Sequence, residues 1–262
     1  FAGVGVGAAF MGLRPIVEFM TFNFALQAMD HLINSAAKTH YMSGGRISCP
    51  IVFRGPNGAA ARVGAQHSQD FSSWFAQVPG LKVVAPYSAE DAKGLLKTAI
   101  RDPNPVIFLE NELLYNKTFE ISEEGSELVP IGAARTVRSG EDVTVICFSR
   151  GVEWSLKAAE ELEKMGVSCE VIDLRSLRPL DMAKIIQSVQ KTNHLVAVDE
   201  SWPSMGIASE VGFRVMGDAF DYLDAPVQRV ASEEAPLPYA ANLEQLALPN
   251  AEKIIKAIMT MQ

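Results

Sequence analysis

The sequence has few cysteines and none of the spacings that accompany cysteine chemistry. Cys49, Cys147 and Cys169 are the only three among 262 residues, and no two of them form a C-x-x-C pair. This distribution argues against a disulfide framework and against a zinc knuckle, and it indicates a reducing compartment.

Long hydrophobic runs are also missing. Apolar residues make up 48% of the chain, yet the densest stretch, at 19–24, is interrupted by polar residues. It falls well short of the roughly 18 apolar residues that a membrane span needs. A charged fraction of 21% argues equally against disorder. The composition therefore predicts a folded protein without a membrane span, long enough for two domains.

Positive charge is in short supply. The chain holds 23 Lys and Arg against 31 Asp and Glu, a net charge of −8. Residues 1–125 are nearly balanced, with 11 acids and 10 bases, whereas residues 126–262 hold 20 acids and 13 bases. Nucleic-acid binding needs a basic face, so this acidic half argues against it and suits a basic protein partner.

Several catalytic signatures are absent. The chain has no G-x-x-x-x-G-K-[ST], no H-E-x-x-H and no G-x-S-x-G. The glycines at 3, 5 and 7 follow no strand and are too closely spaced for a dinucleotide loop, so they favour a closely packed helix start. Because the chain opens at Phe1 inside this Gly/Ala run, we expect a further N-terminal segment, which would carry any targeting peptide.

What the sequence does contain is an alternation of strand and helix patterns. Strands are expected at 15–20, 49–53, 81–85, 106–109, 143–148, 169–174, 195–199 and 227–230. Helices are expected at 25–41, 67–77, 88–101, 153–165, 181–192, 208–216 and 251–259. This alternation predicts mostly parallel sheets covered on both faces. Residues 112–130 are polar and aperiodic and are interpreted as a linker. The sequence thus predicts two doubly wound α/β domains, at 1–125 and 126–262.

Three places carry candidate chemistry, each with a structural alternative. His67 follows the glycine-rich loop 55–58 at the end of an expected strand, where α/β proteins place reactive groups, but a surface histidine is the commoner outcome. Phe19, Phe22 and Phe24 form either core or a flat wall for a planar heterocycle. The segment 102–105, Asp-Pro-Asn-Pro, is either an ordinary turn or a cradle of carbonyl oxygens for a monovalent cation.

Taken together, several segments resemble one family. They are 18–24 (EFMTFNF), 34–39 with 41–45, 50–58 (PIVFRGPNG), 66–69 (QHSQ) and 173–179 (DLRSLRP). They are similar to the beta subunits of pyruvate dehydrogenase, the thiamine-diphosphate-dependent decarboxylating component of the 2-oxoacid dehydrogenase complexes. The string 238–250 is similar to alphaproteobacterial and mitochondrial members, which implies a mitochondrial matrix or a bacterial cytoplasm. Branched-chain 2-oxoacid subunits share the His-Ser-Gln string but do not usually carry EFMTFNF.

The resemblance implies a fold, a reaction and partners. The fold is a pyrimidine-binding transketolase-like domain followed by a transketolase C-terminal-like domain. The reaction is the oxidative decarboxylation of pyruvate with reductive acetylation of lipoyl groups on the transacetylase, giving acetyl-CoA and CO2 in the whole complex. The family forms a heterotetramer of two alpha and two beta chains, in which the alpha chain holds the diphosphate and Mg2+ through a Gly-Asp-Gly stretch. This chain has no Gly-Asp-Gly. A branched-chain beta subunit and a non-catalytic assembly subunit remain as alternatives.

The resemblance also implies roles for individual residues. Phe24 would stack on the aminopyrimidine ring with Gln27 nearby, and His67 would face the thiazolium and position or protonate substrate-derived groups. Backbone oxygens would hold a structural potassium ion at Ile51, Ala99, Ile100, Asp102 and Asn104. Asp224 would make a charged contact with a basic module of the transacetylase. The family's activating glutamate falls before the segment that matches Phe1, so neither Glu18 nor any other acid here takes that role.

Overall fold

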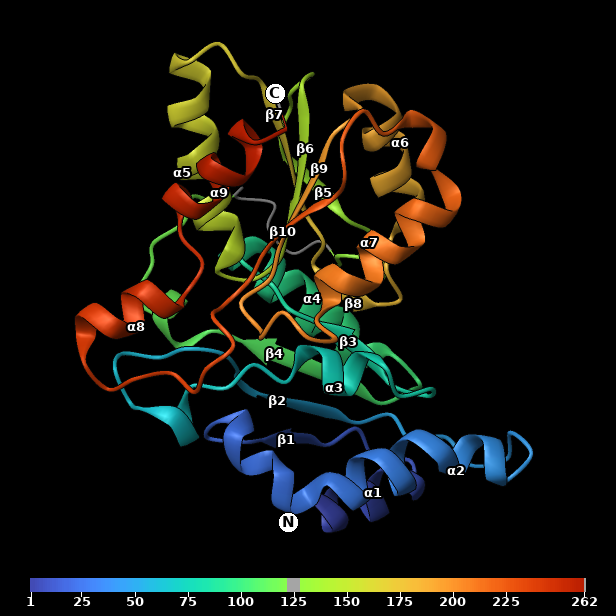
Figure 1. Cartoon of the computed structure of the whole chain (residues 1–262). Helices are drawn as coiled ribbons and strands as arrows, with labels where there is room; N and C mark the ends of the chain where they lie inside the picture. Colours follow the sequence, from blue (N-terminus) through green and yellow to red (C-terminus); the bar gives the residue numbers. More distant parts are fainter. Residues whose placement is uncertain (122–127, 262) are drawn as a thin grey trace.

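Two five-stranded sheets form the framework of the molecule (Figure 1). The computed structural model describes residues 1–121 and 128–261. The first sheet has the order β1 (Ile16–Glu18), β2 (Val52–Pro56), β4 (Val106–Glu110), β3 (Lys82–Val84) and β8 (Ser176–Arg178). The second has the order β10 (Gln228–Val230), β9 (Leu195–Val198), β6 (Val143–Cys147), β7 (Cys169–Asp173) and β5 (Arg135–Arg138). The predicted α/β class is confirmed, since among the described strands only β8 and β5 pair antiparallel.

Helices cover these sheets on both faces. In the first half they are α1 (Ala2–Phe10), α2 (Ala37–Met42), α3 (Ser72–Ala76) and α4 (Ala89–Arg101). In the second half they are α5 (Gly151–Lys164), α6 (Met182–Thr192), α7 (Ile207–Asp218), α8 (Ala241–Ala247) and α9 (Ala251–Met259). Helices α5 and α9 pack on one face of the second sheet and α6 and α7 on the other (Figure 1). Within the two described ranges, no helix is long and apolar enough to cross a membrane.

Two expected helices are broken into shorter pieces. The helix expected at 25–41 is a 3-10 segment, η1 (Phe22–Ala28), then a π-helical segment, η2 (His31–Ala36), and then α2. The helix expected at 67–77 is wrong over its first half, where the 3-10 turn η3 (Ala65–His67) precedes α3. Further 3-10 turns lie at η4 (Glu112–Leu114) and η5 (Phe220–Tyr222). Two hydrogen bonds to the loop after β2 account for the second break. Asn57 Oδ1 accepts from the Phe71 N–H, and the Gly58 N–H donates to the Gln69 carbonyl, so these backbone groups bond to the loop and not within a helix.

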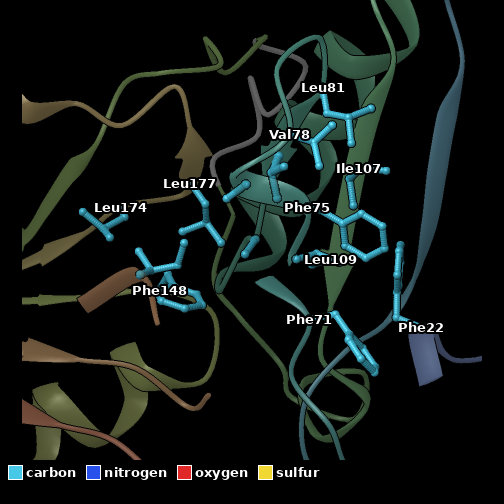
Figure 2. Close-up of a cluster of buried hydrophobic side chains, with 14 of the residues drawn as sticks. Phe22, Phe71, Phe75, Val78, Leu81, Ile107, Leu109, Phe148, Leu174 and Leu177 are labelled. Carbon is cyan, nitrogen blue, oxygen red and sulfur yellow. The ribbon is translucent and has the colours of Figure 1, made fainter. Parts of the chain in front are cut away.

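The largest buried core runs through both halves of the chain. Figure 2 shows Phe75, Ile107 and Leu109 of the first half in the same view as Leu174 and Leu177 of the second. Strand β8 enters this region from the second half and pairs with β3, opposite Val83 and Val84. The predicted boundary between residues 125 and 126 lies outside the described residues and stays a prediction.

Candidate functional site

The candidate site lies where β1 and β2 end. These neighbouring strands are parallel, with Glu18 opposite Arg54, so the segments that follow them emerge at one edge of the sheet. The chain after β1 enters η1, and the chain after β2 enters a loop that begins at Asn57. Gly55 allows the close approach, because a Cβ at this position would lie 2.2 Å from the Phe19 carbonyl oxygen.

Asn23 holds the two segments together. Its side chain is buried, donates to Thr21 Oγ1 at 2.8 Å, and accepts from both the backbone N–H and the side-chain amide of Gln69, at 3.1 and 3.2 Å. Gln69 lies two residues after His67, and Asn23 directly precedes Phe24. This bridge therefore brings two sequence-predicted residues together: the rings of Phe24 and His67 lie edge to face, 5.2 Å apart at 87°.

A cavity of about 530 Å³ opens beside Phe24. Phe24, Gln27, Glu18, Met20 and His31 are among its lining residues. Phe24 is 42% exposed and Gln27 is exposed, so an aromatic face and an amide are both available to a planar heterocycle. His67 is also exposed and meets Phe24 edge to face, but it is not among the residues that line the cavity.

His31 is a lining residue that no sequence motif indicated. It begins the π-helical segment η2, an irregularity that often marks functional sites. A Cβ at Gly3 would lie 3.0 Å from His31 Cε1, so the glycine leaves room for the imidazole. The helix expected at the glycines 3, 5 and 7 is α1, and it is closely packed at Gly3 and Gly5, whereas a Cβ at Gly7 would meet nothing within 4 Å among the described residues. Because α1 and η2 are brought together only by the fold, the sequence alone carries no signal that indicates His31.

An ionic network connects this edge of the sheet to the next strand. Arg54 pairs with Glu18 and binds both oxygens of Glu110, with Nε and Nη2 at 2.6 and 2.8 Å. The Tyr115 hydroxyl donates to Glu110 as well. The hydrogen bond to Glu110 raises the pKa of Arg54, and burial together with the same carboxylate raises the pKa of Tyr115. Glu18 is thus held by Arg54, and the resemblance assigns it no catalytic role.

Ser68 adds an unsatisfied group beside His67. Its side chain is 5% exposed, and among the described residues its Oγ has no hydrogen-bond partner. A buried hydroxyl without a partner is costly, so it is a candidate contact for a bound group.

The five residues nominated for a cation lie around the end of α4. Arg14 Nη1 donates to the carbonyl oxygens of Ile100 and Asp102, at 2.9 and 3.1 Å. The Ile51 oxygen accepts from Val106 N–H at 2.9 Å, and the Ala99 oxygen accepts from Asp102 N–H at 3.2 Å. Two of the nominated carbonyl oxygens therefore bind one cationic nitrogen. This shows that the end of α4 attracts positive charge, which Arg14 supplies in this structure.

The carboxylate of Asp102 organises the same turn. Its Oδ1 accepts from the backbone N–H and the side-chain amide of Asn104, both at 2.9 Å, and its Oδ2 pairs with Lys82. Burial alone would raise the pKa of Asp102, but Lys82 and the Asn104 donors outweigh it and lower the pKa. Within residues 1–121 and 128–261, no three His, Cys, Asp or Glu side chains gather closely enough to hold a metal ion.

Asp224 lies elsewhere, on the surface of the second half. It is exposed and lines a cavity of about 710 Å³ along α7 and η5, together with Phe213, Met216 and Arg229. Its backbone N–H donates to the Asn193 carbonyl at 3.0 Å. The side chain therefore lies at a largely apolar cavity that shares no lining residue with the Phe24 cavity.

Comparisons with known proteins cover almost the whole chain. The family model of the transketolase pyrimidine-binding domain matches residues 1–118, and that of the transketolase C-terminal domain matches residues 132–254.

Curated relatives are about 60% identical to the chain over the residues that align. The mitochondrial pyruvate dehydrogenase E1 component subunit beta-1 of Arabidopsis thaliana is 62% identical over 260 residues, covering 98% of this chain and 72% of the relative. The Caenorhabditis elegans mitochondrial subunit beta is 63% identical over 262 residues, covering 98% and 74%. The Rhizobium meliloti subunit beta is 60% identical over 258 residues, covering 98% of this chain but 56% of that longer protein.

A solved structure described as a split gene transketolase, inactive beta4 tetramer, superposes with a TM-score of 0.81 at 20% identity. The superposition covers 99% of this chain and 79% of the solved chain. At that identity the likeness shows the fold alone.

Proposed function

The chain belongs to the family of pyruvate dehydrogenase E1 component beta subunits, and from this membership we propose that it supplies the pyrimidine side of a thiamine diphosphate site for the oxidative decarboxylation of pyruvate. One observation supports this above the rest: Phe24 and His67 meet edge to face beside a cavity that Phe24 and Gln27 line.

The residues present fit such a cofactor. Phe24 offers a half-exposed ring to a planar heterocycle, and the amide of Gln27 can hydrogen-bond the polar edge of that heterocycle. When bound, thiamine diphosphate supplies a nucleophilic carbon and an electron sink for the loss of CO2. The chain's own contribution is to orient the ring through Phe24, and to hold or deliver a proton at the imidazole of His67.

The proposal includes partners that supply what this chain lacks. The sequence has no Gly-Asp-Gly, so we assign the diphosphate and Mg2+ to an alpha chain, in a tetramer of two alpha and two beta chains. The acceptor is a lipoyl group of the transacetylase. Because the relatives are mitochondrial and bacterial proteins, the proposed compartment is the mitochondrial matrix or a bacterial cytoplasm.

Co-expression of the full-length chain with an alpha chain tests this proposal. The co-purified complex should decarboxylate pyruvate, measured with an artificial electron acceptor, and should turn over branched-chain 2-oxoacids far more slowly. The 262-residue chain alone should be inactive. Thiamine-dependent turnover by the chain alone, or a preference for branched-chain substrates, would contradict the assignment.

A structural potassium ion is a further part of the proposal. It would take backbone oxygens of Ile51, Ala99, Ile100, Asp102 and Asn104, beside the guanidinium of Arg14. A ligand that binds only the folded state raises its thermal midpoint, so KCl should raise the Tm more than choline chloride at equal ionic strength. Equal midpoints in the two salts would remove the ion from the proposal.

Asp224 is the proposed contact for the basic module of the transacetylase. Its exposed carboxylate lies in a half of the chain that holds 20 acids and 13 bases. Asp224→Ala should weaken docking by about 2 kcal/mol, with the loss shrinking as salt rises. The neighbouring Asp221→Ala serves as the matched control. Unchanged affinity of Asp224→Ala at low salt would leave Asp224 as a turn residue.

A further inference from the structure

A second cavity in the first half has no part in the proposed reaction. It measures about 350 Å³ and lies at the carboxyl ends of β2, β3 and β4, over the start of α4. Phe24, Gln27 and His67 are not among its lining residues. Its volume is at the small end of the range for ligand pockets in proteins. The cavity is therefore large enough for one small molecule.

Aromatic rings form the walls. Tyr87 and Phe119 lie edge to face with their centroids 5.3 Å apart, and Phe108 and Tyr115 also line the cavity. Leu96 and Leu114 add aliphatic surface. Rings prefer edge-to-face and offset contacts with other rings, so these walls suit a flat aromatic body better than a branched aliphatic one.

The carboxylate that lines the cavity is already neutralised. Glu110 is buried, binds Arg54 through both oxygens and accepts from the Tyr115 hydroxyl. The cation Lys117 is also paired, with Glu153 at 3.0 Å. These groups satisfy one another and leave no unpaired negative charge on the lining to repel an anion.

The two acids in the first turn of α4 form ion pairs with arginines that do not line the cavity. Glu90 pairs with Arg135 at 3.1 Å, and Asp91 pairs with Arg175 at 2.8 Å. Lys93, two residues after Asp91, lines the cavity, and its side chain has no hydrogen-bond or ion-pair partner in the part of the chain that the structure describes. One unpaired positive charge thus remains at an aromatic cavity, and burial raises the pKa of Tyr87, which keeps its hydroxyl a donor.

We propose that this cavity binds a small aromatic monocarboxylate, with its ring against Tyr87 and Phe119 and its carboxylate at Lys93. The charge and shape of the lining carry this inference, which goes beyond the proposed function and does not rest on it. A neutral ring of the same size would use the walls and leave Lys93 unused, so it should bind more weakly.

A fluorine NMR titration of 4-fluorobenzoate tests the site on the chain in the assembly in which it purifies. We expect saturable binding below about 10 mM, the weak range for a ligand this small. Phe119→Ala should weaken binding about tenfold by removing one wall. Lys93→Gln should weaken it about threefold, the scale of an exposed ion pair. Lys256→Gln, an exposed lysine on α9, is the control and should change nothing.

Other ligands separate this site from the cofactor site. Saturating thiamine diphosphate with Mg2+ should leave the affinity for 4-fluorobenzoate unchanged, and 4-fluorobenzyl alcohol should bind more weakly. Displacement by thiamine diphosphate, no binding up to about 10 mM, or equal affinity in Phe119→Ala and the unaltered chain would each overturn the proposal. Pyruvate turnover is not the readout, so failure here and failure of the proposed reaction are distinguishable.

Discussion

Asn23 is the side chain that turns two separate motifs into one site. Its buried amide is satisfied by Thr21 and Gln69, and through Gln69 it fixes the loop of His67 against η1. The resemblance predicted that Phe24 and His67 serve one cofactor. It did not predict the bridge, because the residues around Asn23 in the sequence do not indicate that its partner lies on the loop after another strand. His31 was missed for the same reason, since its surroundings are built by α1.

His67→Ala is expected to lower turnover of the complex by roughly a hundredfold, the scale of a positioned acid–base group. Assembly and stability should change little, because His67 is exposed and its described side-chain contact is the ring of Phe24. Steady-state kinetics with pyruvate checks this, with His40→Ala on the surface of α2 as the control. Near-normal turnover would make His67 a structural residue.

Asp102→Ala is expected to destabilise the fold by about 1–3 kcal/mol, because it removes the partner of Lys82 and the acceptor of Asn104. Asp102→Asn keeps an acceptor oxygen and should cost less. The folded state lowers the pKa of Asp102, so its contribution is present above the ordinary carboxyl pKa and disappears as the pH falls through the lowered value. Denaturant unfolding at pH 7 and near pH 3 measures this. An Ala variant as stable as the parent at pH 7 would contradict it.

The elements that could be predicted are those whose signals lie within their own residues. The expected 251–259 agrees with α9, and the N-caps of α4 and α6 are Ser88 and Asp181, at the expected helix starts. Strands β5 and β8 were missed because each has three or four residues and owes its pairing to distant partners. The pieces η1, η2 and α2 were taken as one helix, since over short runs an apolar period does not separate 3-10, α and π turns.

Ser88→Ala is expected to cost about 1 kcal/mol by uncapping α4. Ser88 Oγ accepts from the Asp91 N–H at 3.1 Å and lies 3.0 Å from Asp91 Oδ2, to which it donates. Urea unfolding should show a lower midpoint with an unchanged slope. Ser88→Thr, which keeps the hydroxyl, is the matched control and should retain most of the stability. Equal midpoints for the Ala and Thr variants would show that the cap contributes nothing.

Across the whole molecule, the two halves of the chain share a buried core and one of the two sheets. Leu174, Leu177 and Phe148 of the second half belong to the core that contains Phe75 of the first half, and β8 completes the first sheet. The alternation of strands and helices predicted two α/β units but could not predict this sharing. The reason is physical: β8 is short, and what selects its place is the free edge of β3.

A group of acids that are wholly or partly buried forms another contact between the halves. Glu200, in the loop after β9, accepts from the Ala59 N–H in the loop after β2. Its electrostatic neighbours are Asp70, Asp199 and Arg150. Burial, and then the charge of Asp70, raises the pKa of Glu200 to about 8. Burial, and then Asp199, raises the pKa of Asp70 to about 6. The folded chain therefore holds protons here that an unfolded chain releases.

This difference fixes the sign of a pH dependence. An unfolded glutamate titrates near a pKa of about 4.3, so between there and about pH 8 the folded state binds more protons and loses stability as the pH rises. Glu200→Gln keeps the acceptor oxygen for Ala59 and cannot ionise. We expect this variant to gain stability relative to the parent as the pH rises, by about 1 kcal/mol or more between pH 5 and pH 8. Chemical unfolding at a series of pH values measures the difference, with Glu252→Gln on the exposed side of α9 as the control. Parallel pH profiles for the parent and Glu200→Gln would mean that Glu200 is ionised in the folded protein, stabilised by Arg150 and the Ala59 N–H against the cost of its burial.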